Sequence, residues 1–189
     1  MTAPASTTVP RHESPISVVA LHVWPATSET PIPSSEVEVD FSGLPGDRHC
    51  GLTMTSDTRT ARVYPKGLEI RNHRQLSLVS LTELATVAAN LGIDELAPGV
   101  IADNIALAGI DNLTALPRMT RLEFESGAVL MTGGENTPCV IAGRMVAARY
   151  GTRPTAFPKA AIRLRGITAW VDRPGRISVG DAVRTHPPG

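Results

Sequence analysis

The sequence predicts a single, mainly β domain with a few helices, a β-rich α+β chain whose strands close or partly close into a barrel. Its 16 glycines and 16 prolines make up about 17 % of the 189 residues, against a usual share of about 12 %, so turns should be frequent. Hydrophobic residues at 42 % and charged residues at 19 % are typical of a folded globular chain. Short apolar or alternating segments outnumber segments with helical spacing, which favours strands over helices.

Strands are expected where β-branched and apolar residues cluster or alternate with polar ones. In chain order these segments are residues 16–24, 36–41, 75–79, 104–108, 120–125, 127–132, 161–171 and 177–183. Residues 42–72, in contrast, are rich in Gly, Pro, Arg and Thr and show no period. A loop of that length inside a domain is usually functional or mobile.

Two helices are expected. Residues 80–83 (SLTE) have the pattern of a capping box, in which the Ser hydroxyl accepts from the backbone N–H of the Glu and the Glu side chain reaches back. Gly92 would end this helix. The second helix would start with Thr137 as N-cap and Pro138 in the first helical position, and run to about Tyr150. Its buried face would consist of Ile141, Met145 and Ala148.

The chain carries no net charge, so binding to nucleic acid through bulk charge is not expected. Charge is nevertheless uneven along the sequence. Residues 43–74 carry six Arg or Lys against three Asp or Glu, and residues 135–165 carry six against one, whereas residues 75–134 carry two against seven. Two basic segments on either side of an acidic one suggest a local anion site. The excess of Arg over Lys fits planar recognition of anions, and a codon preference for Arg would explain it equally well.

Cys50 and Cys139 are too few for a disulfide framework and form no CxxC motif. No segment approaches the ~18 apolar residues of a membrane span. Residues 1–15 lack the apolar core of a signal peptide and are expected to form a disordered polar tail. Residues 16–185 would then be the domain and residues 186–189 a short tail, in a cytoplasmic protein.

Cys139 is the sharpest candidate for chemistry. The expected helix places it in the first turn after a Thr-Pro entry, where unpaired N–H groups and the helix dipole favour an anion. That environment favours the thiolate, which is both a nucleophile and a soft metal ligand. The alternative is an inert cysteine buried under the helix start.

Residues 43–51 (GLPGDRHCG) form a second candidate, because glycines bracket an Asp, an Arg and a His. The Asp can orient the Arg or fix the tautomer of the His, and the loop could hold a phosphate or a carboxylate. The alternative is a tight turn with a structural Asp–Arg pair. Arg163 and Arg165 fall on one face of the strand expected at 161–171, where they would either face solvent or line a cavity.

Taken together, these motifs resemble a MOSC domain, which is found at the C-terminus of molybdenum cofactor sulfurases and as free-standing bacterial proteins. The resemblance covers about residues 16–185. It rests on the order and spacing of residues 43–51 (GLPGDRHCG), 74–78 (RQLSL), 98–99 (PG), 103–105 (DNI), 109–111 (GID), 116–117 (LP), 137–139 (TPC), 165–167 (RGI) and 180–181 (GD).

The resemblance implies a barrel-like β fold and a cysteine, here Cys139, that is the catalytic residue and ligates molybdenum in the pterin cofactor or handles sulfur. The residues that it implies for cofactor binding are Arg48, His49, Arg74, Asn104, Thr137 and Arg165. The chain departs from the family in residues 102–104, which read Ala-Asp-Asn in place of Gly-Glu-Asn, and in Cys50, where a small residue is usual. A pyridoxal-phosphate desulfurase domain and the extra N-terminal barrel of amidoxime-reducing relatives do not fit into 189 residues.

Two active functions follow from the resemblance. In the first, Cys139 ligates molybdenum and the protein reduces N-hydroxylated small compounds with electrons from a separate donor protein. In the second, Cys139 carries a persulfide received from a separate cysteine desulfurase and passes it to the cofactor or to another acceptor. A third possibility is a fold member that only binds an anion. Cys50 is a candidate resolving thiol for Cys139, with a purely packing role as the alternative.

Overall fold

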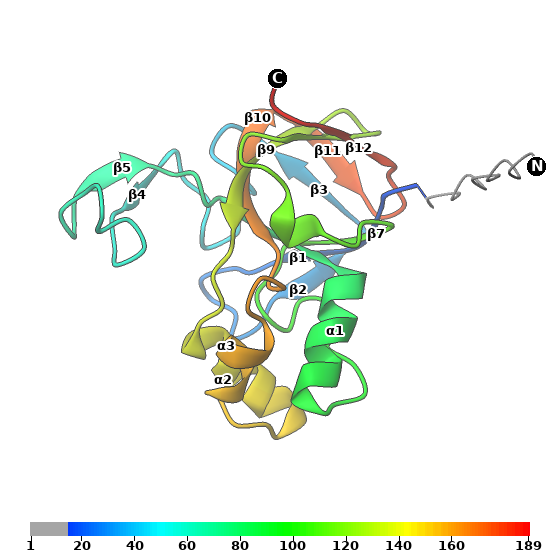
Figure 1. The fold of residues 1–189 in the computed structure, drawn as a ribbon. Coiled ribbons are helices and arrows are strands. Elements are labelled where there is room, and N and C mark those ends of the chain that lie inside the picture. Colours follow the sequence, from blue (N-terminus) through cyan, green and yellow to red (C-terminus); the bar gives the residue numbers. More distant parts are fainter. Residues whose placement is uncertain (1–14) are drawn as a thin grey trace, which may run out of the picture.

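The structure is a computed structural model in which residues 15–189 are described. An eight-stranded mixed sheet forms its centre. The sheet order is β12-β8-β9-β10-β6-β7-β1-β2, and two further pairs, β11-β3 and β4-β5, complete the strands. Figure 1 shows the strands in the upper part and the helices gathered below them. The strands are β1 (Ser17–Val23), β2 (Ile32–Ser34), β3 (Glu36–Val39), β4 (Thr53–Thr55), β5 (Glu69–Arg71), β6 (Leu76–Ser80), β7 (Ile105–Ala108), β8 (Arg121–Phe124), β9 (Val129–Glu135), β10 (Ile167–Arg173), β11 (Gly175–Ser178) and β12 (Val183–His186).

The helix α1 (Leu81–Leu91) connects β6 to β7, which are the parallel neighbours in an otherwise antiparallel large sheet. A crossover of this kind is what a parallel pair requires. Ser80 accepts from the backbone N–H of Glu83, and Gly92 ends the helix in the left-handed conformation, as the sequence predicted. The Glu83 side chain does not reach back, however. It accepts from the backbone N–H and the hydroxyl of Thr114, at 2.8 and 2.7 Å.

The large sheet does not form a closed barrel. Its edges in residues 15–189 are β12 and β2, although three backbone hydrogen bonds bring the start of β1 beside the turn before β12. These bonds join Val18 with Asp181 and with Gly180, and Ile16 with Val183, at 2.8 to 3.0 Å. The mainly β class is therefore confirmed, while the barrel-like part of the prediction is not.

Two apolar clusters hold the fold together. One lies within the sheet and includes Leu78, Leu107 and Leu130, which are fully buried. The other packs α1, α2 (Val140–Tyr150) and α3 (Ala156–Ala160) against the sheet, with Phe157 fully buried among them. Because burial of apolar side chains is the main stabilising term in folding, these clusters are the frame on which the loops between them are positioned.

Residues 161–165, predicted as part of a strand, are instead a turn after α3, and β10 begins only at Ile167. Arg163 has a φ of 58° and Gly166 a φ of 84°, which are values of a turn and not of a strand. The alternation of apolar and charged residues in this segment therefore does not reflect a strand. A Cβ on Gly166 would lie 1.9 Å from the carbonyl oxygen of Leu78, so this crossing over β6 admits only glycine. Arg163 and Arg165 consequently do not share a strand face.

The helix α2 begins at Val140, two residues later than predicted, and Cys139 is its N-cap with φ −138° and ψ 162°. Pro138 is outside the helix, and Thr137 is not the cap. The shift also changes the buried face, which consists of Ala142, Gly143 and Val146. Ile141 and Met145, predicted as core, line a cavity instead, and Ala148 is exposed.

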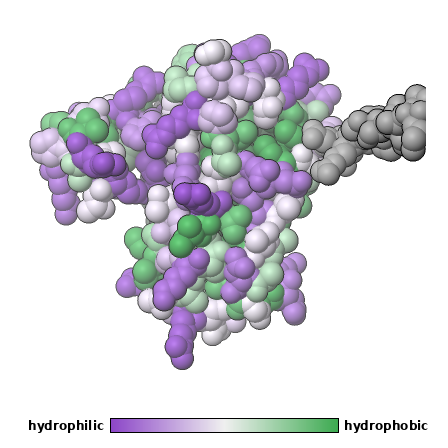
Figure 2. All heavy atoms as spheres, in the orientation of Figure 1, coloured by the Kyte–Doolittle hydropathy of each residue, from purple (hydrophilic) through white to green (hydrophobic). Residues whose placement is uncertain are grey.

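Other boundaries also differ. Residues 177–183 are not one strand, because a turn at 179–181 separates β11 from β12. The segment 42–72 contains the hairpin β4–β5. Residues 52–71, which include this hairpin and the loop between its strands and which we call the arm, project from the body of the molecule (Figure 1). Figure 2 shows apolar side chains both on this arm and at the helical end. The arm exposes Leu52, Val63, Tyr64 and Leu68. Except for Pro15, the predicted polar tail lies outside the described residues.

Candidate functional site

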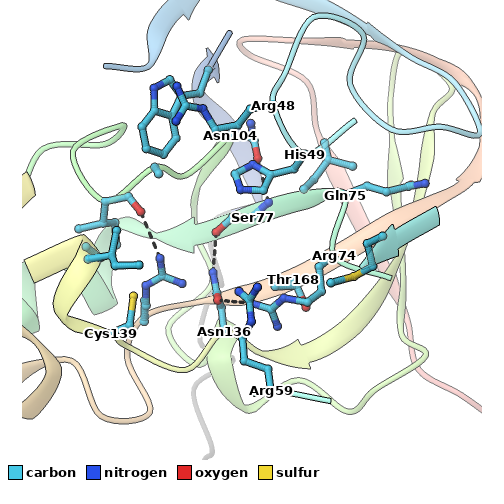
Figure 3. A pocket seen from close by; sticks show the side chains of 18 of the residues that line it. Arg48, His49, Arg59, Arg74, Gln75, Ser77, Asn104, Asn136, Cys139 and Thr168 are labelled. Atoms are coloured by element: carbon cyan, nitrogen blue, oxygen red, sulfur yellow. Dashed lines mark hydrogen bonds between the residues drawn. The ribbon is translucent and has the colours of Figure 1, made fainter. Parts of the chain in front are cut away.

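A cavity of about 480 Å³ opens between the loop 44–51, the arm, the start of β6 and the start of α2. Its size falls within the range typical of small-molecule sites. It brings together every site residue that the sequence analysis named, which are Arg48, His49, Arg74, Asn104, Thr137, Cys139 and Arg165. Segments distant in sequence therefore converge on one space, as Figure 3 shows for most of these side chains.

Cys139 is exposed at the N-terminus of α2 and forms no disulfide. Cys50 is also a free thiol. As N-cap, Cys139 lies beside the first N–H groups of the helix, where the dipole favours negative charge. Arg59, Arg74 and Arg165 line the same cavity and lie close enough to Cys139 for a charge on its sulfur to interact with theirs. The sulfur is thus accessible and lies among cations, as a nucleophilic or metal-ligating thiolate requires.

Three guanidinium groups, from Arg59, Arg74 and Arg165, form what we call the arginine wall of the cavity. Burial lowers the pKa of Arg74 to about 10, and the like charges of Arg59 and Arg165 act in the same direction. Arg59 comes from the arm, where its side chain pairs with Asp57 and lowers the pKa of that carboxyl to about 2. Like charges gathered in this way favour an anion between them.

Arg165 is the least solvated member of the arginine wall, with 9 % of its surface exposed. Its Nη2 donates to the carbonyl oxygen of Ile101 at 3.3 Å, whereas its buried Nε has no hydrogen-bond partner within residues 15–189. Burial lowers the pKa of Arg165, and the charges of Cys139 and Asp103 oppose that effect. A buried guanidinium N–H without a partner is costly, so the arrangement indicates a missing acceptor.

Opposite the arginine wall, residues 47–49 form what we call the loop wall, centred on the carboxylate of Asp47. This carboxylate accepts from the backbone N–H of Trp24 at 2.8 Å, from that of His49 at 2.9 Å and from Nδ2 of Asn104 at 2.9 Å. Nδ1 of His49 lies 3.0 Å from it. Burial alone would raise the pKa of Asp47, but the hydrogen bonds from His49 and Trp24 outweigh burial, so the pKa lies below its ordinary value.

Arg48 lines the cavity, but its guanidinium is held mainly by residues 24–28. Its guanidinium carbon lies 3.6 Å from the centre of the Trp24 ring, a cation–π contact. Its Nη2 also donates to the carbonyl oxygens of Pro25 and Ser28, at 3.0 and 2.8 Å. These contacts tie Arg48 to the loop after β1 and leave it fewer donors for a ligand.

A chain of amide hydrogen bonds joins the two walls (Figure 3). Asn136 accepts from Nη2 of Arg74 and donates to the hydroxyl of Ser77, both at 2.9 Å. The backbone N–H of Ser77 donates in turn to Asn104 at 3.0 Å. Asn104 also donates to Asp47 and to the carbonyl oxygen of His22, so its amide is fully used within the protein.

Sequence reasoning missed Arg59, Ser77 and Asn136 as parts of the site. Asn136 directly precedes the Thr-Pro-Cys motif, so its position was the available signal. Arg59 lies in a segment without periodicity, and only the fold of the arm brings it to the cavity. Thr137 lines the cavity, and Sγ of Cys50 lies 3.3 Å from the hydroxyl oxygen of Ser42. The resolving-thiol role of Cys50 stays a prediction.

Within residues 15–189, no group of three or more His, Cys, Asp and Glu side chains is placed to hold a metal ion. No helix in this part of the chain is long and apolar enough to cross a membrane.

Comparison with known proteins gives a consistent result. The model of the family described as MOSC domain matches residues 53–184. The YuaD protein of Bacillus subtilis, whose name assigns it provisionally to metal-sulfur cluster biosynthesis, is 36 % identical over 154 residues, which are 80 % of each chain. The crystal structure of the Bacillus subtilis YuaD protein superposes with a TM-score of 0.86 at 32 % identity, over 92 % of this chain and 97 % of that one.

A more distant structure, YiiM from Geobacillus stearothermophilus, superposes with a TM-score of 0.61 at 15 % identity, over 91 % of this chain and 75 % of that one. At that identity the likeness concerns the fold. The loop wall, at residues 47–49, lies before the segment that the family model matches.

Proposed function

The chain belongs to the MOSC domain family, and from this premise we propose that it binds a molybdenum-pterin cofactor through Cys139 and reduces N-hydroxylated small compounds with electrons from a separate donor protein. The single observation that carries the proposal is the arginine wall around an exposed thiol, with the buried Nε of Arg165 lacking an acceptor. A cofactor with a phosphate and a polar pterin matches these donors.

The residues present fit that group. Cys139 supplies a soft, accessible sulfur ligand at a helix start. Arg74 and Arg165 supply planar donors for the phosphate, and Arg59 adds a third cation from the arm. Asn136 and Ser77, already hydrogen-bonded to each other, present polar groups for the pterin edge.

When bound, the molybdenum centre would supply the two-electron chemistry of the reaction. The protein's own residues have other tasks. Cys139 would hold the metal, and the arginine wall would hold the phosphate of the cofactor. The remaining space, open to solvent near His49 and Arg48, would admit a small substrate.

The test is the molybdenum and pterin content of protein purified from cells grown with molybdate. We expect both in near-equal amounts with the wild-type chain, loss of bound molybdenum in Cys139→Ser, and retention in the matched variant Cys50→Ser. Wild-type protein free of molybdenum and pterin under these conditions would rule out the proposal.

The name of the YuaD relative favours a second function, that of a persulfide carrier. In that reaction the Cys139 thiolate attacks the outer sulfur of a desulfurase persulfide. The S–S bond to the desulfurase cysteine breaks, that cysteine leaves as a thiolate, and a new S–S bond forms on Cys139. The exposure of the Cys139 thiol supports such an exchange.

This function is tested by incubating the chain with a cysteine desulfurase and free cysteine, followed by intact-mass analysis. A gain of about 32 Da, for one sulfur atom, is expected on the wild-type chain and on Cys50→Ser but not on Cys139→Ser. No gain in the wild-type chain would exclude the carrier function.

A further inference from the structure

We infer that His49 is the proton-transfer group of the cavity, held by Asp47 so that its Nε2 faces the ligand. The inference rests on the proposed function, in which a reaction takes place beside Cys139. It adds an acid–base role for His49, which the resemblance implies only as a cofactor-binding residue.

The first argument comes from the residues that line the cavity. Reduction of an N–OH group needs protons, and a proton donor must release one near neutral pH. Among the described lining residues there is no Asp, Glu, Lys or Tyr side chain, and the Arg groups do not release protons in this range. Of the two cysteines on this surface, Cys139 is committed to the ligand in the proposed function, and Sγ of Cys50 lies 3.3 Å from the hydroxyl oxygen of Ser42. His49 is the single imidazole on the cavity surface among residues 15–189.

The second argument is the geometry of the ring. The Asp47 carboxylate can only accept, so Nδ1 of His49, 3.0 Å away, carries the hydrogen of that contact. Asp47 is held by the backbone N–H groups of Trp24 and His49 and by Asn104, and its side chain is fully buried. It is therefore a fixed anion. A histidine oriented in this way presents Nε2 on the other side of the ring.

The third argument is access. The side chain of His49 is 51 % exposed, and no hydrogen bond from residues 15–189 reaches its Nε2. The Trp24 ring lies at a centroid distance of 6.4 Å and limits the motion of the imidazole. Figure 3 shows the His49 ring and the Cys139 sulfur on two sides of the same cavity. The ring can thus protonate a ligand on one side and regain its proton from solvent.

The chemical step balances as follows. A hydroxylamine R–NH–OH takes up two electrons and two protons and gives R–NH2 and water. The electrons come from a separate one-electron carrier protein through the bound cofactor. As the N–O bond breaks, imidazolium Nε2–H of His49 gives its proton to the departing oxygen, which leaves as water. The second proton, for the nitrogen, comes from solvent, and Asp47 keeps the ring oriented through its contact with Nδ1.

The first experiment needs no cofactor. The tautomer of His49 is measured by nitrogen-15 NMR of the metal-free wild-type chain, with His49→Gln used to assign the signal. We expect the neutral ring to carry its hydrogen on Nδ1. A hydrogen on Nε2 would overturn the inference whatever the protein binds.

The second experiment uses the molybdenum-loaded protein, N-phenylhydroxylamine as probe and reduced methyl viologen as electron source. We expect His49→Ala to keep its molybdenum and pterin content but to reduce the probe about 100-fold more slowly, which is the usual contribution of a general acid. Added imidazole should restore part of the rate in His49→Ala, because the exposed site leaves room for it. The exposed His186, paired with Glu123 far from the cavity, gives the matched control His186→Gln.

The two failures are distinguishable. Wild-type protein that holds no molybdenum, or holds it and reduces no probe, contradicts the proposed function. A loaded His49→Ala variant that works within twofold of the wild-type rate, or a slow variant that imidazole does not accelerate, overturns the acid–base role alone.

Discussion

The two walls of the cavity are built from similar polar residues but use them in opposite ways. On the loop wall, Asp47 accepts four hydrogen bonds, and its partner Asn104 has its amide nitrogen and oxygen both hydrogen-bonded. On the arginine wall, Arg165 has a buried Nε without a partner, and Arg74 lies close to two like charges. A polar group whose hydrogen bonds are all made within the protein supports the fold, whereas one left unpaired is available to a ligand.

This contrast predicts opposite responses to mutation. Loss of a side chain from the loop wall should lower stability. Loss of one from the arginine wall should leave stability intact and weaken anion binding. The predictions below test this difference in order of expected effect.

The largest effect is expected for Asp47→Asn, which should lower the free energy of unfolding by about 3 kcal/mol. The variant amide places an N–H₂ group against donors from Trp24, His49 or Asn104, so at least one buried donor loses its acceptor. Urea unfolding of the wild type and of Asp47→Asn at pH 7 measures this difference in the free energy of unfolding. A difference below about 0.5 kcal/mol would mean that the loop wall is not a scaffold.

The next effect concerns inorganic phosphate as a probe of the arginine wall. At a hundred times its dissociation constant, a ligand stabilises a native protein by about 2.7 kcal/mol. We expect phosphate to raise the melting temperature of the wild-type chain and to have little effect on Arg165→Met. Without phosphate, the variant should be about as stable as the wild type, because the buried guanidinium that is removed has an unpaired Nε. If phosphate raised the melting temperature of the wild type and of Arg165→Met equally, the anion would not bind at the arginine wall.

A smaller effect should appear in the pH dependence of stability. The folded-state pKa of Asp47 lies below its ordinary value of 3.8. Its stabilising contribution is therefore present above the unfolded-state pKa and is lost as the pH falls through the folded-state pKa. We expect the stability difference between wild type and Asp47→Asn to narrow as the pH falls from about 5 towards about 2. A constant difference over that range would show that the carboxylate charge is not involved.

The smallest effect on stability is expected for Cys139→Ala, which should change the free energy of unfolding by less than about 0.5 kcal/mol. The thiol is exposed and caps no N–H group with its side chain. Chemical denaturation of the cofactor-free variant checks this. A loss of 2 kcal/mol or more, on the order of a core mutation, would instead make Cys139 part of the scaffold.

Local signals in the sequence predicted local structure well. Ser80 and Gly92 delimit α1 because an N-cap and a left-handed glycine act within a few residues of the chain. The start of α2 was predicted too early because Thr137 and Pro138 satisfy the same local rules. In the structure β9 extends to Glu135 and Cys139 still has an extended backbone, so the helix begins two residues later.

The candidate site shows the same difference between what sequence motifs predict and what tertiary contacts decide. The resemblance in motif order selected seven residues that line one cavity in the structure. It did not distinguish Arg48, tied to Trp24 and two carbonyls, from Arg165, buried with an unpaired Nε. Both are arginines in basic segments, and the difference lies only in their neighbours.

The sequence by itself determined the mainly β class, the helix α1 and the family, because composition, capping and motif order are written in consecutive residues. The tertiary structure alone decided that 161–165 is a turn, that Arg59 reaches the cavity from the arm, and which polar groups are left unpaired. The physical reason is that burial and hydrogen-bond pairing depend on residues far apart in the chain, and no local pattern specifies which of them meet.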